Sequence, residues 1–181
     1  PGLPPRVGLP VVGFNSFLVS FPIRFATWNS QALINALSFN QLRANRKLGL
    51  RGKLLGKVDV IAIQETHGDA GDSAALARIF PSWRFLESTA SGSVAGGTLF
   101  AIRRVFASQF SLIEHSTLVP GRVHAVALRS PSGQQLIFVN LHISPSLGLP
   151  DTKALFVRTA SFICRYPPMA GVFIVGDFNY L

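Results

Sequence analysis

The sequence predicts one α/β domain, built as a layered sandwich of mixed sheets in preference to a purely parallel sheet. Apolar, strand-like runs alternate with helical stretches, and a long antiparallel hairpin interrupts that alternation. Apolar residues make up 48% of the 181 residues and charged residues only 14%, so a sizeable buried core is expected and disorder is not. A chain of this length suits one domain better than two.

The predicted strands are short apolar runs bounded by turn residues. They are residues 24–28, 58–64, 83–87, 97–103, 122–128, 134–143 and 171–175. The run at 58–64 is nearly unbroken and rich in β-branched residues, which is typical of a strand buried on both faces. The clearest hairpin joins 122–128 to 134–143 through a turn at 130–133 that contains Pro and Gly.

Four helices are predicted between these strands, at residues 31–37, 42–55, 73–80 and 151–166. Ser73 is expected to cap the third helix, and Pro81 to end it. Asp151 or Thr152 is expected near the cap of the fourth helix, which Pro167 ends.

The first 22 residues differ from the rest, so we expect a linker or upstream segment at 1–22 and the domain at 23–181. Prolines interrupt this apolar segment, which makes it a poor signal peptide, although a cleaved signal remains the alternative. No apolar stretch reaches the roughly 18 residues that a membrane span needs. The chain begins at Pro1 and not at Met, so we expect a piece of a longer protein.

The chain is strongly basic, with 17 Lys and Arg against 8 Asp and Glu and a net charge of +9. Such a surplus favours a polyanionic partner, either nucleic acid or a phosphorylated substrate. The segment from Arg43 to Lys57 is rich in Lys and Arg and contains no Asp or Glu. It is expected either to bind the phosphate backbone of a nucleic acid or to form a solvated helix face. The lone Cys164 cannot form an internal disulfide, which favours an intracellular setting.

Polar side chains stand at the ends of the predicted buried strands, where rigid backbone opens onto a cleft. These residues are Asn29, Glu65, His142, Asp177 and Asn179. Two carboxylates, an imidazole and two amides at one sheet edge would suit metal-assisted hydrolysis of a phosphate ester. Taken singly, each of them is equally explained as a loop residue, a helix cap or a structural group.

Together with their neighbours, these residues resemble a known family. Its motifs occur in order as Thr27-Trp28-Asn29, Ile63-Gln64-Glu65-Thr66-His67, Gly96-Gly97, Asn140-Leu141-His142 and Gly176-Asp177-Phe178-Asn179. From residue 23 onward the chain looks like the endonuclease/exonuclease/phosphatase superfamily, whose members share the DNase I-like layered α/β sandwich. Gln64-Glu65-Thr66-His67-Gly68 is particularly similar to the endonuclease domains of non-LTR retrotransposons.

The resemblance implies a role for each site residue. Asn29 and Glu65 would hold a divalent ion, Mg²⁺ or alternatively Mn²⁺. Asp177 would position or activate the attacking water, Asn179 would contact the scissile phosphate, and His142 would act near the leaving oxygen. Arg122 would contact a phosphate of the substrate.

The sequence departs from the family at its C-terminal end. Family members end with a Ser-Asp-His box that supplies a general-base histidine, and the sequence stops at Leu181 without one. His115 and His124 are expected to be structural. The resemblance therefore implies the N-terminal part of the domain, incomplete at its C-terminus and inactive alone, since losing one member of a cooperating set loses most of the catalysis.

The expected function is Mg²⁺-dependent endonucleolytic hydrolysis of DNA phosphodiesters, as in retroelement endonucleases. The enzyme is expected to be a monomer, and a retroelement origin would imply a nuclear location. A first alternative is the same fold acting on inositol phosphates or sphingomyelin, small phosphate esters. A second is a non-catalytic remnant whose basic face binds nucleic acid. An alternative metal set, Glu65, His67 and Asp69, would share one face if the chain stayed extended there.

Overall fold

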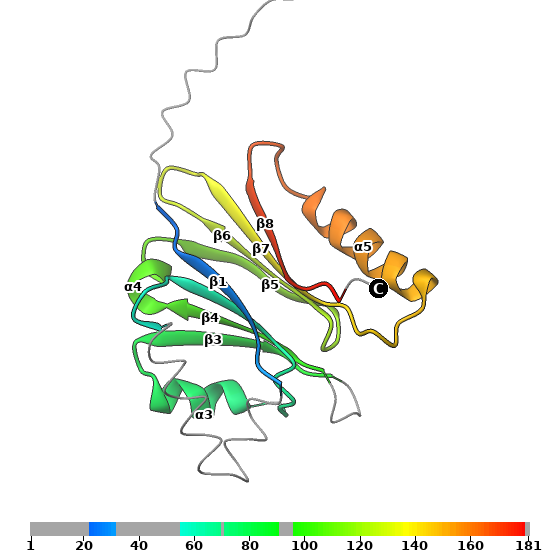
Figure 1. Ribbon diagram of the computed structural model, residues 1–181. Helices are drawn as coiled ribbons and strands as arrows, with labels where there is room; N and C mark the ends of the chain where they lie inside the picture. The colour runs from blue at the N-terminus through cyan, green and yellow to red at the C-terminus, as the bar shows by residue number, and fades with distance from the viewer. Residues whose placement is uncertain (1–21, 32–54, 70, 91–95, 180–181) are drawn as a thin grey trace, which may run out of the picture.

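Two four-stranded sheets pack face to face in this computed structural model, which describes residues 22–31, 55–69, 71–90 and 96–179 (Figure 1). The first sheet has the order β1 (Phe25–Asn29), β2 (Val60–Gln64), β4 (Thr98–Arg103), β3 (Trp83–Ser88). β1 and β2 run parallel, and the other neighbours are antiparallel. The predicted class, a layered α/β fold with mixed sheets, is confirmed.

The second sheet has the order β5 (Ser111–Val119), β6 (Val123–Arg129), β7 (Gln135–His142), β8 (Gly171–Asp177). The predicted hairpin is β6–β7, and its turn is closed by the Gly133 amide donating to the Ser130 carbonyl. β7 and β8 run parallel. β5 was not predicted, because it mixes polar with apolar residues and much of it is exposed, which leaves no apolar run to recognise.

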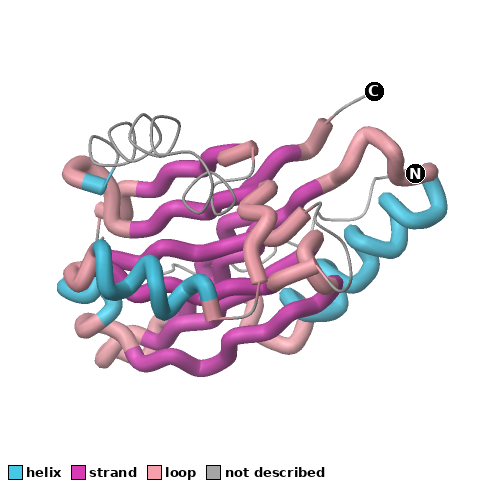
Figure 2. Tube along the Cα trace, turned by 90° about the horizontal axis from the view of Figure 1, so that it is seen from below, coloured by secondary structure: helices cyan, strands magenta, loops and turns pink. Residues whose placement is uncertain are grey.

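Helices cover the outer faces of the two sheets. α3 (Asp72–Ile79) packs against β3, and α5 (Leu149–Ile163) lies over the outer face of the second sheet (Figure 1). The short α4 (Arg104–Ala107) follows β4. Figure 2 shows the same arrangement from below, with the helices in cyan and the strands in magenta. No helix in the described part of the chain is long and apolar enough to cross a membrane.

The predicted Ser73 cap is wrong, whereas Asp151 lies near the start of its helix, as expected. α3 begins after Gly71, whose φ of 100° suits glycine, and the Ser73 amide instead donates to the Glu87 carboxylate over 2.8 Å. α5 begins two residues before Asp151, after Gly148, because Pro150 is readily accommodated in a first helical turn. Asp151 thus lies in the first turn of α5.

Some of the predicted elements cannot be compared with the structure. The helices at 31–37 and 42–55, the segment at 1–22 and most of the basic run from Arg43 to Lys57 lie outside the described residues.

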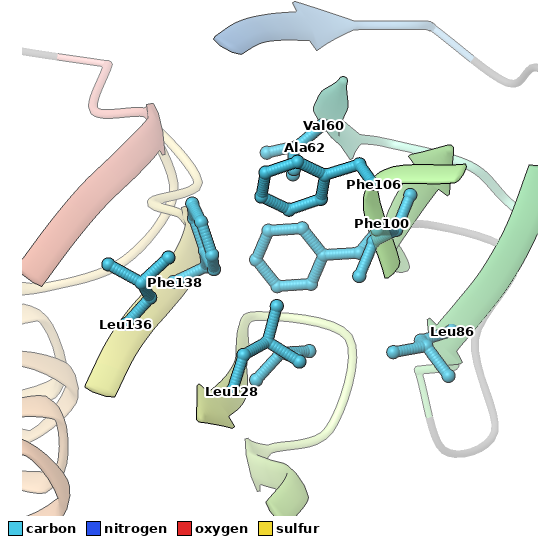
Figure 3. Packing of buried hydrophobic residues seen from close by; sticks show 10 residues of the cluster. Val60, Ala62, Leu86, Phe100, Phe106, Leu128, Leu136 and Phe138 are labelled. Carbon is cyan, nitrogen blue, oxygen red and sulfur yellow. The ribbon is translucent and has the colours of Figure 1, made fainter. Parts of the chain in front are cut away.

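Aromatic and aliphatic side chains fill the space between the sheets (Figure 3). Phe100 of β4 and Phe138 of β7 are fully buried there, and the Phe138 ring stacks on Phe25 of β1 and Phe173 of β8 at centroid distances of 5.8 Å and 5.0 Å. Burying such side chains is the main stabilising contribution to the sandwich. It holds the two sheets together.

The two parallel strand pairs determine where polar strand ends meet. In β1 and β2, Asn29 is paired with Gln64, and in β7 and β8, His142 is paired with Asp177. The edge strands β1 and β8 contact each other across the sandwich. The C-terminal ends of β1, β2, β7 and β8 therefore come together at one end of the molecule.

Candidate functional site

Glu65, His142 and Asp177 form a cluster at this end of the sandwich. One ligand atom from each lies within 4.8 Å of the other two. Glu65 directly follows β2, His142 ends β7 and Asp177 ends β8, so both sheets contribute. This is the one group of at least three His, Cys, Asp or Glu residues found close enough to hold a metal ion in the described parts of the chain.

The backbone of Glu65 is held in an unusual conformation. Its φ is 52°, in the left-handed region that costs a non-glycine residue of order 1 kcal/mol or more. The Ser30 hydroxyl lies 2.8 Å from the Gln64 carbonyl oxygen and 3.0 Å from that of Glu65, and donates to them. The Thr66 amide donates to the Gly97 carbonyl. These contacts hold the turn that sends the Glu65 side chain into the cluster.

The Asp177 carboxylate is positioned by two donors. The Asn29 side-chain amide donates to Oδ2 over 2.6 Å, and the Asn179 backbone amide donates to Oδ1 over 3.2 Å. Asn29 Oδ1 accepts from the Gln31 amide, so its amide group bridges β1 and the end of β8. At Gly176 a Cβ atom would collide with the Leu141 carbonyl, so β8 can approach β7 closely only with glycine there.

His142 is 3% exposed, and its two ring nitrogens have different surroundings. Arg122 donates to Nδ1 over 3.1 Å. Nε2 lies 3.2 Å from Glu65 Oε1, yet it makes no aligned hydrogen bond with any described residue. Burial lowers the pKa of His142, the nearby Arg122 charge lowers it further, and the Glu65 and Asp177 carboxylates oppose both effects. Because Arg122 can only donate, the neutral ring carries its proton on Nε2.

The remaining predicted residues lie around this cluster. Asn179 has a φ of 36° and its side-chain amide donates to the Ile143 carbonyl over 2.9 Å, which fixes it beside Asp177. Arg122, predicted to contact substrate, contacts His142 in the structure. Asn29 is predicted to be a metal ligand beside Glu65, and in the structure it contacts Asp177.

The alternative metal set of Glu65, His67 and Asp69 is not brought together. The chain leaves the strand after Gln64, and His67 has a φ of 50°. Side chains two residues apart therefore do not share one face. The Asp69 backbone amide donates a hydrogen bond to the carboxylate of Asp72, the first residue of α3.

His115 and His124 contact each other and are not members of the cluster. They belong to β5 and β6, and their Nε2 atoms are 2.7 Å apart. His124 is fully buried, with its ring 5.0 Å from that of Phe100. Burial lowers the pKa of His124 to about 3, and the His115 charge adds to this effect, so its ring is neutral at neutral pH.

Sequence reasoning missed the residues that support the cluster from behind. Ser30 follows the Asn29 motif, and Gln64 and Asn140 each lie within a motif, but their buried contacts join segments far apart in the chain. Their only sequence signal is a polar residue at the end of an apolar strand. That signal indicates an unusual position, not its partner.

The donor set matches a hard divalent cation. Carboxylate and amide oxygens are the ligands that Mg²⁺ and Ca²⁺ take, and Mg²⁺ needs one or two carboxylates with the rest of its shell as water. The buried Nε2–H of His142 faces Glu65 without an aligned partner, which suits a site whose full complement includes a further oxygen acceptor. The cluster is thus equipped to bind a cation together with an anionic group.

Comparisons with known proteins identify the family and the fold. The model of the Endonuclease/Exonuclease/phosphatase family matches residues 26–181. No curated protein sequence gives a significant match. Among solved structures, an endonuclease/exonuclease/phosphatase family protein from Bacteroides thetaiotaomicron superposes with a TM-score of 0.62 at 14% identity, over 87% of this chain and 63% of that one.

Two further solved structures have the same fold. The mannosyl-6-phosphatase of Bacteroides thetaiotaomicron matches with a TM-score of 0.58 at 14% identity, over 87% of this chain and 65% of its own. A 3′ phosphatase from Neisseria bound to a product DNA hairpin matches with a TM-score of 0.54 at 18% identity, over 87% and 58%. The chain spans about three fifths of the length of these structures.

Proposed function

Because the chain belongs to the endonuclease/exonuclease/phosphatase family, we propose that its Glu65–His142–Asp177 cluster is a metal-dependent site for phosphodiester hydrolysis. Members of this family are hydrolases that act on phosphodiesters or phosphate esters. The observation that carries the proposal is the convergence of two carboxylates and a buried imidazole at one end of the sandwich, where His142 Nε2 lies 3.2 Å from Glu65 Oε1 without an aligned hydrogen bond.

Glu65 and Asn29 are the proposed ligands of the divalent cation, with Mg²⁺ as the preferred ion and Mn²⁺ as an alternative. Oxygen donors favour these hard cations. The Asn29 side chain already contacts Asp177 through its amide nitrogen. A shift of this side chain would let its Oδ1 bind the cation. When bound, the cation would neutralise negative charge on the phosphate.

The neighbouring side chains take the other proposed roles. Asp177, held by two donors, orients the attacking water through its carboxylate. His142 directs its Nε2–H at the phosphate oxygen on which charge accumulates, because Arg122 occupies Nδ1. Asn179 has one amide hydrogen left after its bond to Ile143 and presents it to the phosphate. Arg122 adds positive charge next to the same anion.

DNA is the proposed substrate, and nicking by a retroelement-type endonuclease is the proposed reaction. Support comes from the net charge of +9, which favours a polyanion, and from the Gln64-Glu65-Thr66-His67-Gly68 motif. A structure of the same fold, from Neisseria, holds a product DNA hairpin. The step from fold to DNA is an analogy.

A small phosphate ester is the second candidate substrate. The mannosyl-6-phosphatase shares the fold, and a histidine at position 142 is compatible with inositol phosphates or sphingomyelin as well. The same catalytic cluster would serve either substrate, because the reacting phosphate group is the same. The choice between them depends on surfaces that surround the cluster.

We further propose that the 181 residues alone hydrolyse either substrate slowly or not at all. The family resemblance implies a general-base histidine in a Ser-Asp-His box, and the metal-binding cluster among the described residues contains one histidine, His142. Groups that act as a unit lose most of their effect when one is absent. A remnant that only binds nucleic acid is the limiting case.

Mn²⁺ binding to the 181-residue chain, followed by electron paramagnetic resonance, tests the site independently of turnover. One Mn²⁺ per chain is expected, displaced by Mg²⁺ and lost in Glu65→Gln, while Asp69→Asn in the nearby loop binds normally. Nicking of supercoiled DNA and phosphate release from inositol phosphates are then measured with Mg²⁺. Equal Mn²⁺ binding by Glu65→Gln and the parent chain would remove Glu65 from the site. Phosphate release from inositol phosphates without nicking of DNA would show that a small phosphate ester, and not DNA, is the substrate.

A further inference from the structure

A buried pair of amide side chains links the two sheets behind the cluster. Gln64 Nε2 of β2 donates to Asn140 Oδ1 of β7 over 2.6 Å. Gln64 is 1% exposed and Asn140 is fully buried. The strands belong to different sheets, so this hydrogen bond crosses the sandwich.

Both amides are well supplied with partners. The second hydrogen of Gln64 Nε2 goes to the Thr27 hydroxyl of β1, over 3.1 Å. Asn140 Nδ2 donates to the carbonyls of Ile63 and Leu99, over 3.0 Å and 3.2 Å. The network therefore reaches β1, β2, β4 and β7. A fully satisfied buried network rigidifies its surroundings, whereas a partly satisfied one destabilises them.

The position of the pair along its strands is what matters. Toward the interior, β2 presents Val60 and Ala62, and β7 presents Leu136 and Phe138, all in the apolar layer of Figure 3. Apolar contacts are non-directional, so they do not by themselves fix the sliding of one sheet over the other to a fraction of an ångström. A short hydrogen bond between two amides has a fixed geometry. The apolar layer ends in this directional contact.

The site residues follow directly. Glu65 is the next residue after Gln64, and His142 lies two residues after Asn140. His142 Nε2 and Glu65 Oε1, which are 3.2 Å apart, come from the two strands that the pair joins. Any slip of β7 against β2 would change this separation.

We propose that Gln64 and Asn140 are positioning residues that set the separation of Glu65 and His142 across the two sheets. This proposal rests on the proposed function for the metal and phosphate roles of those two residues. Its structural part, the local ordering of the site end by one cross-sheet hydrogen bond, can be measured separately.

The experiment compares Gln64→Met, which keeps the length and removes the donors, with Phe138→Leu in the 181-residue chain. Phe138 faces the same interior from β7, two residues before Asn140, and serves as the control for a general loss of packing. Two quantities are measured: the Mn²⁺ dissociation constant, and hydrogen exchange at the amides of Thr66, His67 and Ile143, which are bonded in the strand ends.

Gln64→Met is expected to weaken Mn²⁺ binding about 10-fold or more, the effect typical of residues that support metal ligands. The same variant is expected to speed exchange at the three amides relative to the rest of the sheets. Phe138→Leu should change exchange broadly and leave Mn²⁺ affinity within about 2-fold. Equal patterns in the two variants would overturn the proposal, because the pair would then contribute only stability.

A second variant covers the possibility that Gln64→Met folds poorly. Gln64→Met/Asn140→Leu removes both side-chain amides, so neither is left facing an apolar group, although the carbonyls of Ile63 and Leu99 lose a donor. It is expected to recover part of the stability lost in Gln64→Met, without recovering Mn²⁺ affinity or amide protection. Recovery of all three would overturn the proposal. A parent chain that binds no Mn²⁺ would refute the proposed function, and the exchange data would still decide the positioning role.

Discussion

Arg122 donates to Nδ1 of His142 over 3.1 Å, and this contact determines which ring nitrogen carries the proton. Arginine cannot accept a hydrogen bond, so Nδ1 is the acceptor and Nε2 bears the hydrogen. Nε2 is also the nitrogen that lies beside Glu65. One interaction at the start of β6 thus orients and polarises a side chain at the end of β7.

Replacing this arginine should disturb His142 more than it disturbs the fold. In Arg122→Met the Nδ1 acceptor loses its donor and the neighbouring positive charge disappears, so the pKa of His142 rises and both tautomers become populated. Nitrogen NMR of the imidazole ring measures both effects. Arg129→Met, at the other end of β6, is the control and should leave the His142 signals unchanged. An unchanged tautomer in Arg122→Met would contradict the assigned role.

Where hydrolysis can be measured, Arg122→Met should lower kcat about 10-fold or more, as expected for loss of a positioned proton donor. Arg122→Lys keeps a positive charge and one donor, and we expect an intermediate value. A change confined to KM would instead assign Arg122 to substrate binding alone.

Acid should destabilise the protein through His124. Its pKa is lowered to about 3 in the fold against an ordinary value of 6.5, so the unfolded chain binds more protons between these values. Stability therefore rises with pH across this window and is lost as pH falls below about 6.5, by up to about 1.4 kcal/mol per pH unit.

The measurement for His124 is the urea midpoint from pH 7 to pH 4. His124→Leu removes the titrating group, so its midpoint should change less with pH than that of the parent chain. His67→Ala, outside the sheets, is expected to retain the parent slope. Parallel pH profiles for His124→Leu and the parent chain would show that another group controls acid stability.

Gly176→Ala should destabilise the fold and displace Asp177. The added Cβ would meet the Leu141 carbonyl, and backbone atoms cannot yield as a flexible side chain can. Overpacking of this kind costs about 1–3 kcal/mol. Gly171→Ala, on the same strand, is the control, because its Cβ would come close to the end of the Leu136 side chain, at 3.0 Å, and make only ordinary contacts otherwise. Equal loss of stability in the two variants, measured by urea unfolding, would argue against a close-approach role for Gly176.

The outer face of β8 should make the 181-residue chain associate. Val172 and Ile174 are 40% and 45% exposed there. Among the described residues β8 is an edge strand of the second sheet, where exposed apolar surface favours association. Val172→Thr/Ile174→Thr keeps β-branched residues while adding hydroxyls, and should raise the concentration at which association begins. Sedimentation velocity measures this concentration, with Val105→Thr on α4 as the control. Association unchanged in the double variant would place the contact elsewhere.

The strands that carry the motifs were predictable because their apolar runs are continuous. β2 and the β6–β7 hairpin have strong signals of this kind, and the structure confirms them. β5 could not be predicted, since it is stabilised by pairing with β6 and its own sequence lacks an apolar pattern. The predicted cap residue Ser73 was wrong, because α3 begins after Gly71, whereas Asp151 lies in the first turn of α5, close to the cap as expected.

The site was predictable only as a set of strand ends. Glu65, His142 and Asp177 were expected together, and the structure brings their ligand atoms together. The contacts that orient them could not be predicted. The Arg122–His142 and Gln64–Asn140 contacts each join residues far apart in the sequence, and no local pattern encodes such a distance or angle.

The hydrogen bond between Asn29 and Asp177 joins residues 148 positions apart, at the ends of the first and the last described strands. During synthesis the ribosome adds about 5–20 residues per second, so roughly 7 to 30 s separate the appearance of the two partners. During that interval β8 has not been synthesised, so β1 lacks its contact across the sandwich and Phe25 lacks its stacking partner Phe173. The nascent chain therefore passes through a stage in which most of the described strands have been synthesised and Asp177 has not, so the cluster can form only after residue 177 has been added.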